Sequence, residues 1–333
     1  MKRVEVATAC LLFFYILLPW LELGPAPSAN IFLVSSGEPF YTVARRLEEQ
    51  GFVRNHREFI ILGWLSGASQ RIRVGEYNFS GLKSPSQILT KLLQGKSIIY
   101  RVMVLEGDSI PKVAELLEQE GLASAQGFLE KASDPELLAA LGIQADSLEG
   151  YLYPDTYFWT KGLTEEEMIG QMVSRFWKAF DERLAARARE MNMTIQEVVT
   201  LASLIEREAT MDREKPLISG VFHNRLKLGI KLQSDPTAVY GRDDFSGRIT
   251  RADLRRRSDY NTYFIYGLPP GPIANPGKES LKAALYPAAV NYLYFVSKND
   301  GTHFFSSSLR EHNRAVARYQ ASRRPVNGQR EKF

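Results

Sequence analysis

The sequence predicts an α+β fold in which an N-terminal membrane anchor precedes a small α/β region and a larger mixed α+β domain. Three observations carry this prediction. An apolar run comes first, a strand–turn–helix pattern then occurs twice, and a helix-rich stretch with Gly- and Pro-rich loops follows. We expect the parts to span residues 1–29, 30–122 and 123–333. With 44% hydrophobic and 24% charged residues, the chain can bury cores of this size.

The apolar run is the candidate membrane anchor. Lys2 and Arg3 precede residues 6–23, which as a helix are just long enough to cross a hydrocarbon core of about 30 Å. Because basic residues favour the cytoplasmic side, we expect a single pass through the inner (cytoplasmic) membrane, with the N-terminus inside and the rest of the chain outside or periplasmic. A cleaved signal peptide is the alternative, since residues 26–29 include small residues.

Composition and motifs exclude several classes of function. The net charge of +4 arises from 42 basic and 38 acidic residues, so nucleic acid is not an expected partner. The only cysteine, Cys10, lies in the apolar run, which leaves no disulfide and no thiol chemistry for the rest of the chain. The sequence has no Cys/His cluster with metal spacing, no Gly-x-Ser-x-Gly elbow and no P-loop. We therefore expect neither a metal nor another cofactor.

A repeat with an offset of 70 residues fills the second region. Residues 33–51 can be laid over residues 103–121, and each copy predicts a strand, a glycine turn and an amphipathic helix that ends at glycine. This pattern resembles the LysM module, a small βααβ unit that binds polymers containing N-acetylglucosamine. The resemblance implies a LysM-like glycan-binding region, formed by the two copies together or by each separately. Coincident pairs include Val34/Val104, Gly37/Gly107, Val43/Val113, Ala44/Ala114, Leu47/Leu117 and Gly51/Gly121.

Other elements are predicted from periodicity and caps. Residues 59–65 predict a buried helix and residues 74–79 a strand. A helix over residues 84–95 has Ser as its N-cap, Pro in its first turn and Gly at its end. In the larger domain we expect one long helix over residues 164–188 and a strand over residues 292–296.

A further helix carries the candidate catalytic group. A capping box at residues 194–197 fixes its start, and residues 201–205 supply an apolar stripe. Glu208 continues this stripe, so partial desolvation should raise the pKa of its carboxyl and keep it protonated near neutrality. A general acid for glycosidic cleavage needs this property. Glu206, on the flank of the helix, is the alternative acid, and a solvent-exposed Glu208 paired with Arg213 is the non-catalytic alternative.

Residues 201–209 closely resemble a signature of the YceG-like (MltG) family of endolytic murein transglycosylases. The family carries its catalytic acid at the second glutamate of this signature, which is Glu208. It often has Thr or Ser at the next position, where this chain has Ala209, and this difference removes a hydroxyl partner but not the acid. Other family-like stretches follow in order along nearly the whole chain, at residues 149–156, 221–226, 232–237, 260–263, 267–277, 292–296, 303–305 and 311–313.

The resemblance implies a lyase that cuts the β-1,4 bond between N-acetylmuramic acid and N-acetylglucosamine inside glycan strands and leaves 1,6-anhydromuramic ends. Nascent glycan during wall synthesis would be the substrate, and peptidoglycan strands, the cytoplasmic membrane and cell-wall synthesis proteins would be the partners. One carboxyl suffices when the sugar's own C6 hydroxyl is the nucleophile. A hydrolytic muramidase needs a second carboxylate, which we do not expect near Glu208. A wall-binding scaffold is the third possibility.

Polar and aromatic residues in the family-like stretches are candidates for binding sugars. Amide and carboxylate side chains form hydrogen bonds with hydroxyl and N-acetyl groups, and tyrosine rings offer faces to sugar rings. Core packing is the alternative for the tyrosines. We expect His303, His312 and Asn313 to have structural roles or to lie behind the site. The candidate substrate-binding residues are Gln233, Asp235, Tyr240, Tyr260, Asn261 and Tyr263.

Overall fold

The computed structural model describes residues 30–68, 70–242, 245 and 247–320. The predicted anchor lies outside these residues, and none of the helices within them is both long and apolar enough to cross a membrane. Two compact units alternate along the described chain, so the division expected at residue 122 stays a prediction. Unit 1 comprises residues 30–102, 116–124 and 156–168, and unit 2 comprises residues 103–115, 125–155 and 169–320.

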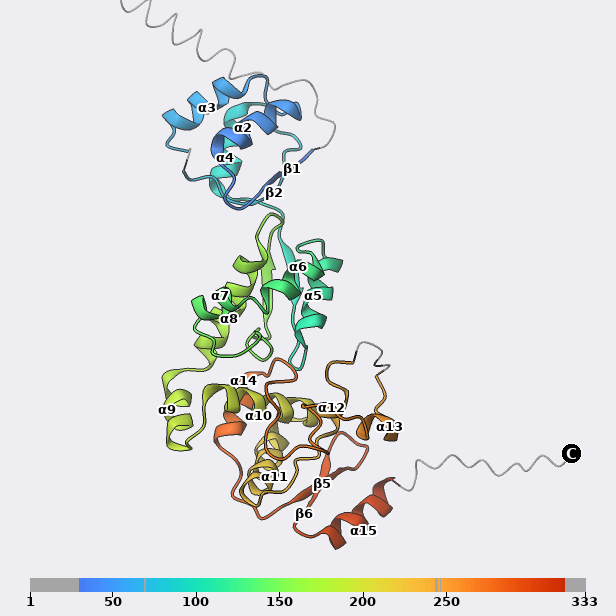
Figure 1. Cartoon of the computed structure of the whole chain (residues 1–333). Helices are drawn as coiled ribbons and strands as arrows, with labels where there is room; N and C mark the ends of the chain where they lie inside the picture. Colours follow the sequence, from blue (N-terminus) through green and yellow to red (C-terminus); the bar gives the residue numbers. More distant parts are fainter. Residues whose placement is uncertain (1–29, 69, 243–244, 246, 321–333) are drawn as a thin grey trace, which may run out of the picture. The chain divides into compact units, whose positions relative to one another are not determined.

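Unit 1 begins with a βααβ arrangement (Figure 1). Strand β1 (Ile31–Val34) pairs antiparallel with β2 (Gly75–Asn78), with Phe32 opposite Tyr77. The helices α2 (Phe40–Glu49) and α3 (His56–Leu65) lie between the two strands in the sequence. Strand β2 therefore forms where the alternation of residues 74–79 predicts it.

The helix predicted after β2 is α4 (Pro85–Gln94). Ser84 accepts a hydrogen bond from the backbone N–H of Gln87, and Gly95 ends the helix with a left-handed φ of 66°. Apolar residues from the two strands and three helices form the core of unit 1. The fully buried members include Phe32, Val43, Leu47, Phe59, Tyr77, Ile88 and Leu92.

Helix α3 differs from the buried helix predicted for residues 59–65. Phe59 and Gly63 are buried, and a Cβ at Gly63 would collide with the Phe40 ring of α2. On the opposite side, however, Trp64 and Leu65 are 73% and 65% exposed. The prediction was wrong because this helix is apolar around its circumference, and periodicity cannot show that its neighbours cover only one side.

The second copy of the repeat begins at β3 (Tyr100–Met103), which pairs with β4 (Thr156–Trp159). Helix α5 (Ile110–Gln119) starts and ends 70 residues after α2, in agreement with the sequence repeat. The helices α6 (Ala125–Lys131) and α7 (Pro135–Ala140) follow it before β4. Two copies of a strand–helix–helix plan are therefore present, and the second holds an additional helix.

Glycine recurs in the repeat because the backbone requires it. Gly37 and Gly107, in the two strand-to-helix turns, have φ values of 71° and 84°. Gly51 and Gly121, which follow the two helices, have φ values of 79° and 64°. Residues with a Cβ rarely adopt this left-handed region, so these four glycines set the boundaries of the elements.

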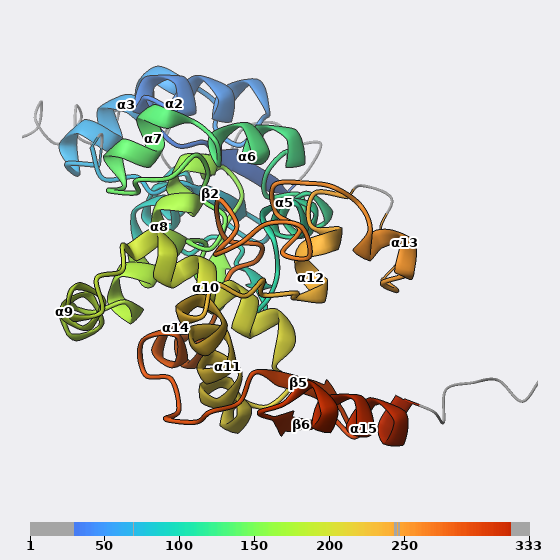
Figure 2. The same ribbon diagram turned by 60° about the horizontal axis from the view of Figure 1, so that its bottom comes forward.

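Unit 2 is built around α10 (Ile195–Glu208), which packs against α11 (Lys215–Lys227) and α14 (Lys278–Leu285), as Figures 1 and 2 both show. Residues 198–205 of α10 are all buried. The long helix expected over residues 164–188 is instead two helices, because the Asp181 carboxylate caps a new helix at the N–H groups of residues 183 and 184. The other elements are α8 (Glu165–Ala179), α9 (Glu182–Glu190), α12 (Asp235–Val239), α13 (Arg251–Leu254), β5 (Tyr294–Ser297), β6 (His303–Ser306) and α15 (Leu309–Gln320).

An antiparallel hairpin of β5 and β6 lies against α15. Strand β5 begins two residues after the start of the strand predicted for residues 292–296, and Phe295 lies opposite Phe305 of β6. Elsewhere in unit 2, the strand-to-helix turn of the second copy contacts the end of α10. The Arg207 guanidinium donates to the carbonyl oxygen of Gly107 at 3.1 Å, and the N–H of Gly107 donates to the carbonyl oxygen of Asn275 at 2.9 Å.

Candidate active site

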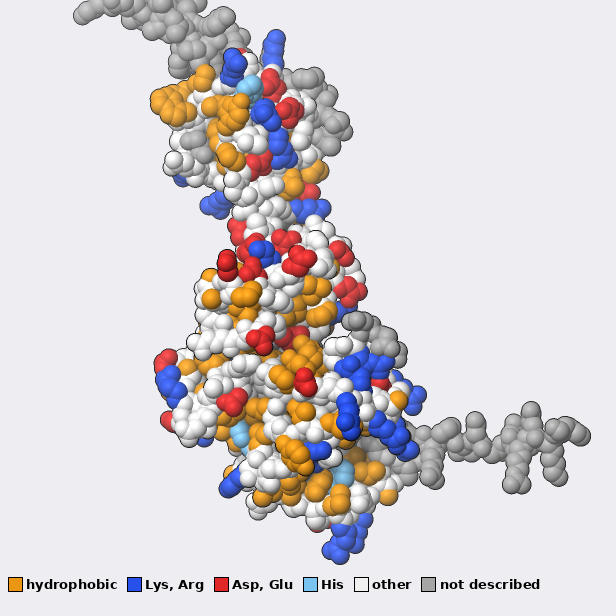
Figure 3. Space-filling view, in the orientation of Figure 1, with side chains coloured by type: hydrophobic (Ala, Val, Ile, Leu, Met, Phe, Trp, Pro, Cys, Tyr) orange, Lys and Arg blue, Asp and Glu red, His pale blue; other side chains and the backbone are white. Residues whose placement is uncertain are grey.

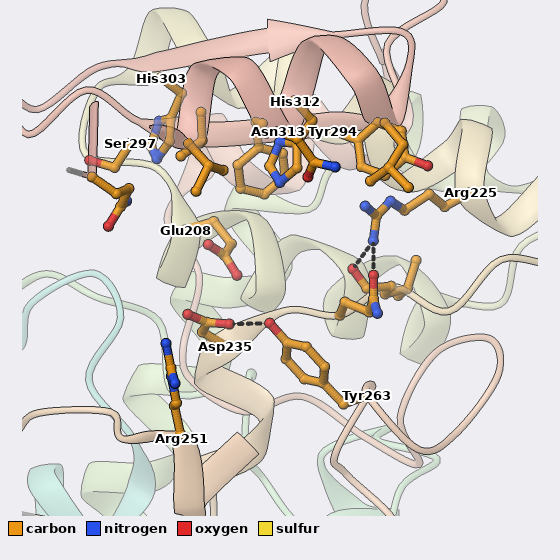
Figure 4. Close-up of a pocket in the computed structure, with 17 residues that line it drawn as sticks. Glu208, Arg225, Asp235, Arg251, Tyr263, Tyr294, Ser297, His303, His312 and Asn313 are labelled. Carbon is orange, nitrogen blue, oxygen red and sulfur yellow. Dashed lines mark hydrogen bonds between the residues drawn. The ribbon is translucent and has the colours of Figure 1, made fainter. Parts of the chain in front are cut away.

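A cavity of about 820 Å³ opens in unit 2 at the end of α10 (Figure 4). Its wall is formed by α10, α11, the β5–β6 hairpin, α15 and the segments that carry α12 and α13. This volume suits a ligand of at least disaccharide size. The polar residues that line it are Glu208, Arg225, Gln233, Asp235, Arg251, Tyr263, Tyr294, Ser297, His303, His312, Asn313 and Gln320.

Glu208 reaches this cavity because α10 has a fixed start and a fixed end. The hydroxyl of Thr194 accepts from the N–H of Glu197, and the Glu197 carboxylate accepts from the N–H of Thr194, which completes the predicted capping box. The helix runs through the core and ends at Glu208, because Ala209 adopts extended backbone with φ −83° and ψ 127°. The last side chain of a buried helix is thus held at the edge of the cavity.

Burial is the main influence on the Glu208 carboxyl and raises its pKa to about 7. The Ser234 hydroxyl donates a hydrogen bond to Oε1 of Glu208 at 2.5 Å and opposes this shift. The nearby Asp235 carboxylate raises the pKa further, while the Arg207 and Arg225 guanidinium groups lower it. A carboxyl that titrates near neutrality can give a proton in one step and accept one in the next.

Ser234 is held in place by a buried network of hydroxyl groups. Its N–H donates to Oγ1 of Thr262 at 2.8 Å, and Oγ1 of Thr237 donates to its carbonyl oxygen at 2.6 Å. The two threonine hydroxyls lie 2.8 Å apart, and all three residues are buried. The preceding residue, Gln233, has a left-handed φ of 49°. The backbone therefore directs the Ser234 hydroxyl at Glu208.

Glu206, the alternative acid, has different surroundings. Its side chain is 7% exposed, and the Lys215 ammonium lies 3.1 Å from its Oε1. The N–H of Gly277 donates to Oε2 of Glu206 at 2.9 Å, and Lys215 also pairs with Asp212 at 2.9 Å. Glu206 does not line the cavity. The structure gives it the role of a buried partner that neutralises a lysine.

Asp235 brings a second carboxylate to the cavity that holds Glu208 (Figure 4). It is the first residue of α12, and the Tyr263 hydroxyl donates to its Oδ1 at 2.6 Å. The expectation of no second carboxylate near Glu208 was therefore wrong. Asp235 was predicted only as a sugar-binding residue, and it reaches the cavity of Glu208 because folding brings two separate helices together. Sequence-predicted residues Gln233, Asp235 and Tyr263 all line this cavity.

Arg225 joins the walls of the cavity. Its Nη1 donates to the carbonyl oxygen of Leu232 at 2.8 Å and to Oε1 of Gln233 at 3.3 Å, contacts that Figure 4 shows. Its Nε donates to the carbonyl oxygen of Leu293 at 2.7 Å, and the guanidinium lies over the Tyr294 ring, 5.1 Å from the centroid. One buried cation thus fixes the turn before α12 to the β5 strand.

The other three predicted sugar-binding residues lie away from the cavity lining. The Tyr240 hydroxyl donates to the Glu149 carboxylate at 3.1 Å, and its ring packs against Tyr260 with centroids 4.6 Å apart. Asn261 is fully buried, and its side-chain amide donates to the carbonyl oxygen of Arg256 at 2.5 Å. In this structure these side chains contribute to packing and loop formation, and their role in sugar binding stays a prediction.

Eight polar residues of the cavity were absent from the predicted set or had been expected only in structural roles or behind the site. They are Arg225, Arg251, Tyr294, Ser297, His303, His312, Asn313 and Gln320. The His303 ring binds the Glu214 carboxylate at 2.7 Å, and the His312 ring stacks on Tyr294 at 5.2 Å. Burial lowers the pKa of His312. The family-like stretches contained both histidines, but no local periodicity distinguished them from packing residues.

Known proteins resemble this chain over most of its length. A model of the YceG-like family matches residues 32–318. The endolytic murein transglycosylase of Bacillus subtilis is 30% identical over 305 residues, which cover 87% of this chain and 84% of that protein. The endolytic murein transglycosylase of Streptococcus pneumoniae serotype 2 is 27% identical, and the match spans 58% of its length. The crystal structure of a protein described as YceG-like, from Listeria monocytogenes, has 29% identity and a TM-score of 0.60, and the match covers 85% of this chain and 97% of that one.

Proposed function

The chain belongs to the YceG-like family, and we propose that it is a lytic transglycosylase that cuts peptidoglycan glycan strands from within. The observation that carries this proposal is the position of Glu208. Its carboxyl lies in a cavity of sufficient size, accepts a hydrogen bond from Ser234 and has a pKa of about 7. The names of the relatives from Bacillus and Streptococcus support the same substrate.

In the proposed reaction, the bond between C1 of N-acetylmuramic acid and O4 of N-acetylglucosamine breaks. Protonated Glu208 gives its proton to O4 as that oxygen leaves. The resulting carboxylate then accepts the proton of the C6 hydroxyl while O6 bonds to C1, which closes the 1,6-anhydro ring. No water is consumed, and Glu208 returns to its protonated state. Intramolecular attack replaces the water and the second carboxylate that a hydrolase needs.

The cavity walls offer groups that would hold the sugar in this reaction. Tyr263 lies on the side of Asp235, while Tyr294 and His312 lie across from them on β5 and α15 (Figure 4). Gln233 lines the same cavity. Their amide, hydroxyl and ring groups suit the hydroxyl, N-acetyl and ring faces of a glycan. Ser234 keeps the Glu208 carboxyl oriented and stabilises its ionised form between the two proton transfers.

We also propose a location for the enzyme. We place the anchor at residues 6–23 and the described chain outside the cytoplasmic membrane, where nascent glycan and wall-synthesis proteins would be within reach. The β1–α2–α3–β2 order supports a LysM-like glycan-binding role for the first copy of the repeat. A bound strand would then be presented repeatedly to the cavity, which raises its local concentration.

Asp235 favours a second candidate, a hydrolytic muramidase. In that reaction Asp235 would activate a water molecule or attack C1, and the product would carry a reducing end. The hydrogen bond from Tyr263 occupies one Asp235 oxygen, which disfavours this role. Mass spectrometry separates the two reactions, because each hydrolytic product is heavier than the anhydro product by one water.

The decisive experiment digests purified glycan with the wild-type chain, with Glu208→Gln and with Asp235→Asn. We expect anhydro ends from the wild type, retained anhydro chemistry in Asp235→Asn, and a loss of rate on the order of 10³-fold or more in Glu208→Gln. Glu206→Gln is the matched control, since it removes a carboxylate two positions away on the same helix. Activity that survives in Glu208→Gln but disappears from folded Glu206→Gln would show that the acid is misassigned.

A further inference from the structure

Packing within unit 1 leaves the outer side of α3 exposed. Ile61, Trp64 and Leu65 are 50%, 73% and 65% exposed. At 100° per residue they occupy one sector of about 100°, opposite the buried Phe59 and Gly63. Large apolar side chains gathered on one exposed face mark a docking surface. Figure 3 shows hydrophobic side chains gathered at the position of α3.

A basic residue borders the same side of the helix. Arg57 is exposed and precedes Ile61 by four residues and Trp64 by seven, so all three project from one face. We name Arg57, Ile61, Trp64 and Leu65 the α3 face. It combines aliphatic side chains with a tryptophan and an arginine, which is the composition of helices that lie in the membrane interface.

We propose that the α3 face docks on the lipid headgroup region of the membrane that carries the anchor. This inference rests on the anchor proposed for residues 6–23. Six residues, 24–29, join that segment to Asn30, and fully extended they span at most about 22 Å. Unit 1 has roughly 95 residues, and a compact unit of that size is about 30 Å across. The tether therefore holds unit 1 within about its own diameter of the bilayer.

Each group of the α3 face has a physical reason to favour lipid. Ile61 and Leu65 leave water, while the indole of Trp64 places its ring among acyl carbons and its N–H among headgroups. The Arg57 guanidinium is attracted to anionic headgroups. Burial of one large apolar side chain changes the ratio of docked to undocked molecules by roughly ten-fold or more. Docking would give unit 1 a fixed orientation on the bilayer.

The test uses the full chain, since Cys10 is its only cysteine and Cys10→Ser gives a background for single labels. A nitroxide at Leu65→Cys reports on the α3 face, and one at Thr90→Cys, exposed on α4, is the matched control. In vesicles of phosphatidylethanolamine and phosphatidylglycerol, we expect a water-soluble nickel chelate to reach position 65 at least five-fold less than position 90. The added pair Ile61→Ser and Trp64→Ser should restore access, because it removes two apolar groups.

Several results would overturn the inference. Equal access at positions 65 and 90 would show that the face stays in water. Protection that persists in detergent, or that accompanies cross-linking between copies, would mean that the chain itself covers the face. Protection that appears only after a membrane-protein extract is added would assign the face to a protein partner. Flotation and glycan digestion of the same vesicles test the anchor and the enzyme separately, so a failure of docking alone is recognisable.

Discussion

The hydrogen bond from Ser234 to Glu208 should set the pH at which the enzyme loses activity. Glu208 must be protonated to start the proposed reaction, so kcat/KM should fall as pH rises above the pKa of about 7. Ser234 lowers this pKa by stabilising the carboxylate. Ser234→Ala removes the donor and leaves burial as the dominant influence. The alkaline limb of the pH profile should therefore move to higher pH.

The size of the shift follows from the energy of the hydrogen bond. A hydrogen bond to a charged group contributes about 1.5–3 kcal/mol, and one pKa unit corresponds to about 1.4 kcal/mol. Because Glu208 is partly exposed to the cavity, we take the lower value, which moves the limb by about one unit, to near pH 8. The same loss destabilises the carboxylate formed after the first proton transfer. The plateau of kcat should fall by about ten-fold.

The assay is the release of anhydro products from purified glycan, measured across pH for the wild type, Ser234→Ala and Ser234→Thr. Ser234→Thr keeps a hydroxyl, so its alkaline limb should lie between those of the wild type and Ser234→Ala. Ser203→Ala is the matched control, because Ser203 is a buried serine of α10 whose hydroxyl donates to the carbonyl oxygen of Thr200. An alkaline limb that stays at its wild-type position, or moves to lower pH in folded Ser234→Ala, would refute this reasoning.

Three further predictions concern stability. Glu206→Gln should lower the free energy of unfolding by about 1–3 kcal/mol in urea titrations, because Lys215 is 3% exposed and loses its buried partner but keeps Asp212 at 2.9 Å; an unchanged midpoint would contradict the ion pair. Burial raises the pKa of Glu149 from 4.5 to about 7, so its contribution to stability is present below pH 4.5 and is lost as pH rises through 7. Glu149→Gln should abolish this pH-dependent loss in the free energy of unfolding, which is roughly 3 kcal/mol at most. If the variant and the wild type show the same pH dependence of unfolding, the prediction for Glu149 is wrong. Gly63→Ala should lower the thermal midpoint by several degrees through its collision with Phe40, and a neutral result would show that α2 and α3 can separate freely.

Features encoded locally could be predicted from the sequence. The capping box of α10, the Ser84 cap and the glycines at Gly37 and Gly107 act within a few residues of their own position, so the pattern alone identifies them. Helical phase also predicted Glu208 at the end of a buried stripe, and the structure agrees that burial raises its pKa. Those predictions needed no knowledge of distant contacts.

Features that depend on distant contacts could not be predicted in this way. Asp235 reaches Glu208 from another helix, and Tyr294 and His312 meet only because a strand and a helix pack together. Tyr240 is of a residue type that often binds sugars, yet its hydroxyl donates a hydrogen bond to Glu149, a contact that the sequence does not reveal. The exposure of α3 has the same cause, since an apolar helix is buried only where neighbours exist to cover it.

The two copies of the repeat also have an evolutionary consequence. A shared plan with a 70-residue offset is what a tandem duplication leaves in a chain. The first copy forms its own compact core, whereas the turn of the second copy, at Gly107, supports Arg207 beside the candidate acid. The duplicates are therefore no longer interchangeable. We expect the first copy to tolerate exchange for another module of similar size, whereas the second copy, tied to α10 through Gly107 and Arg207, should change together with that helix.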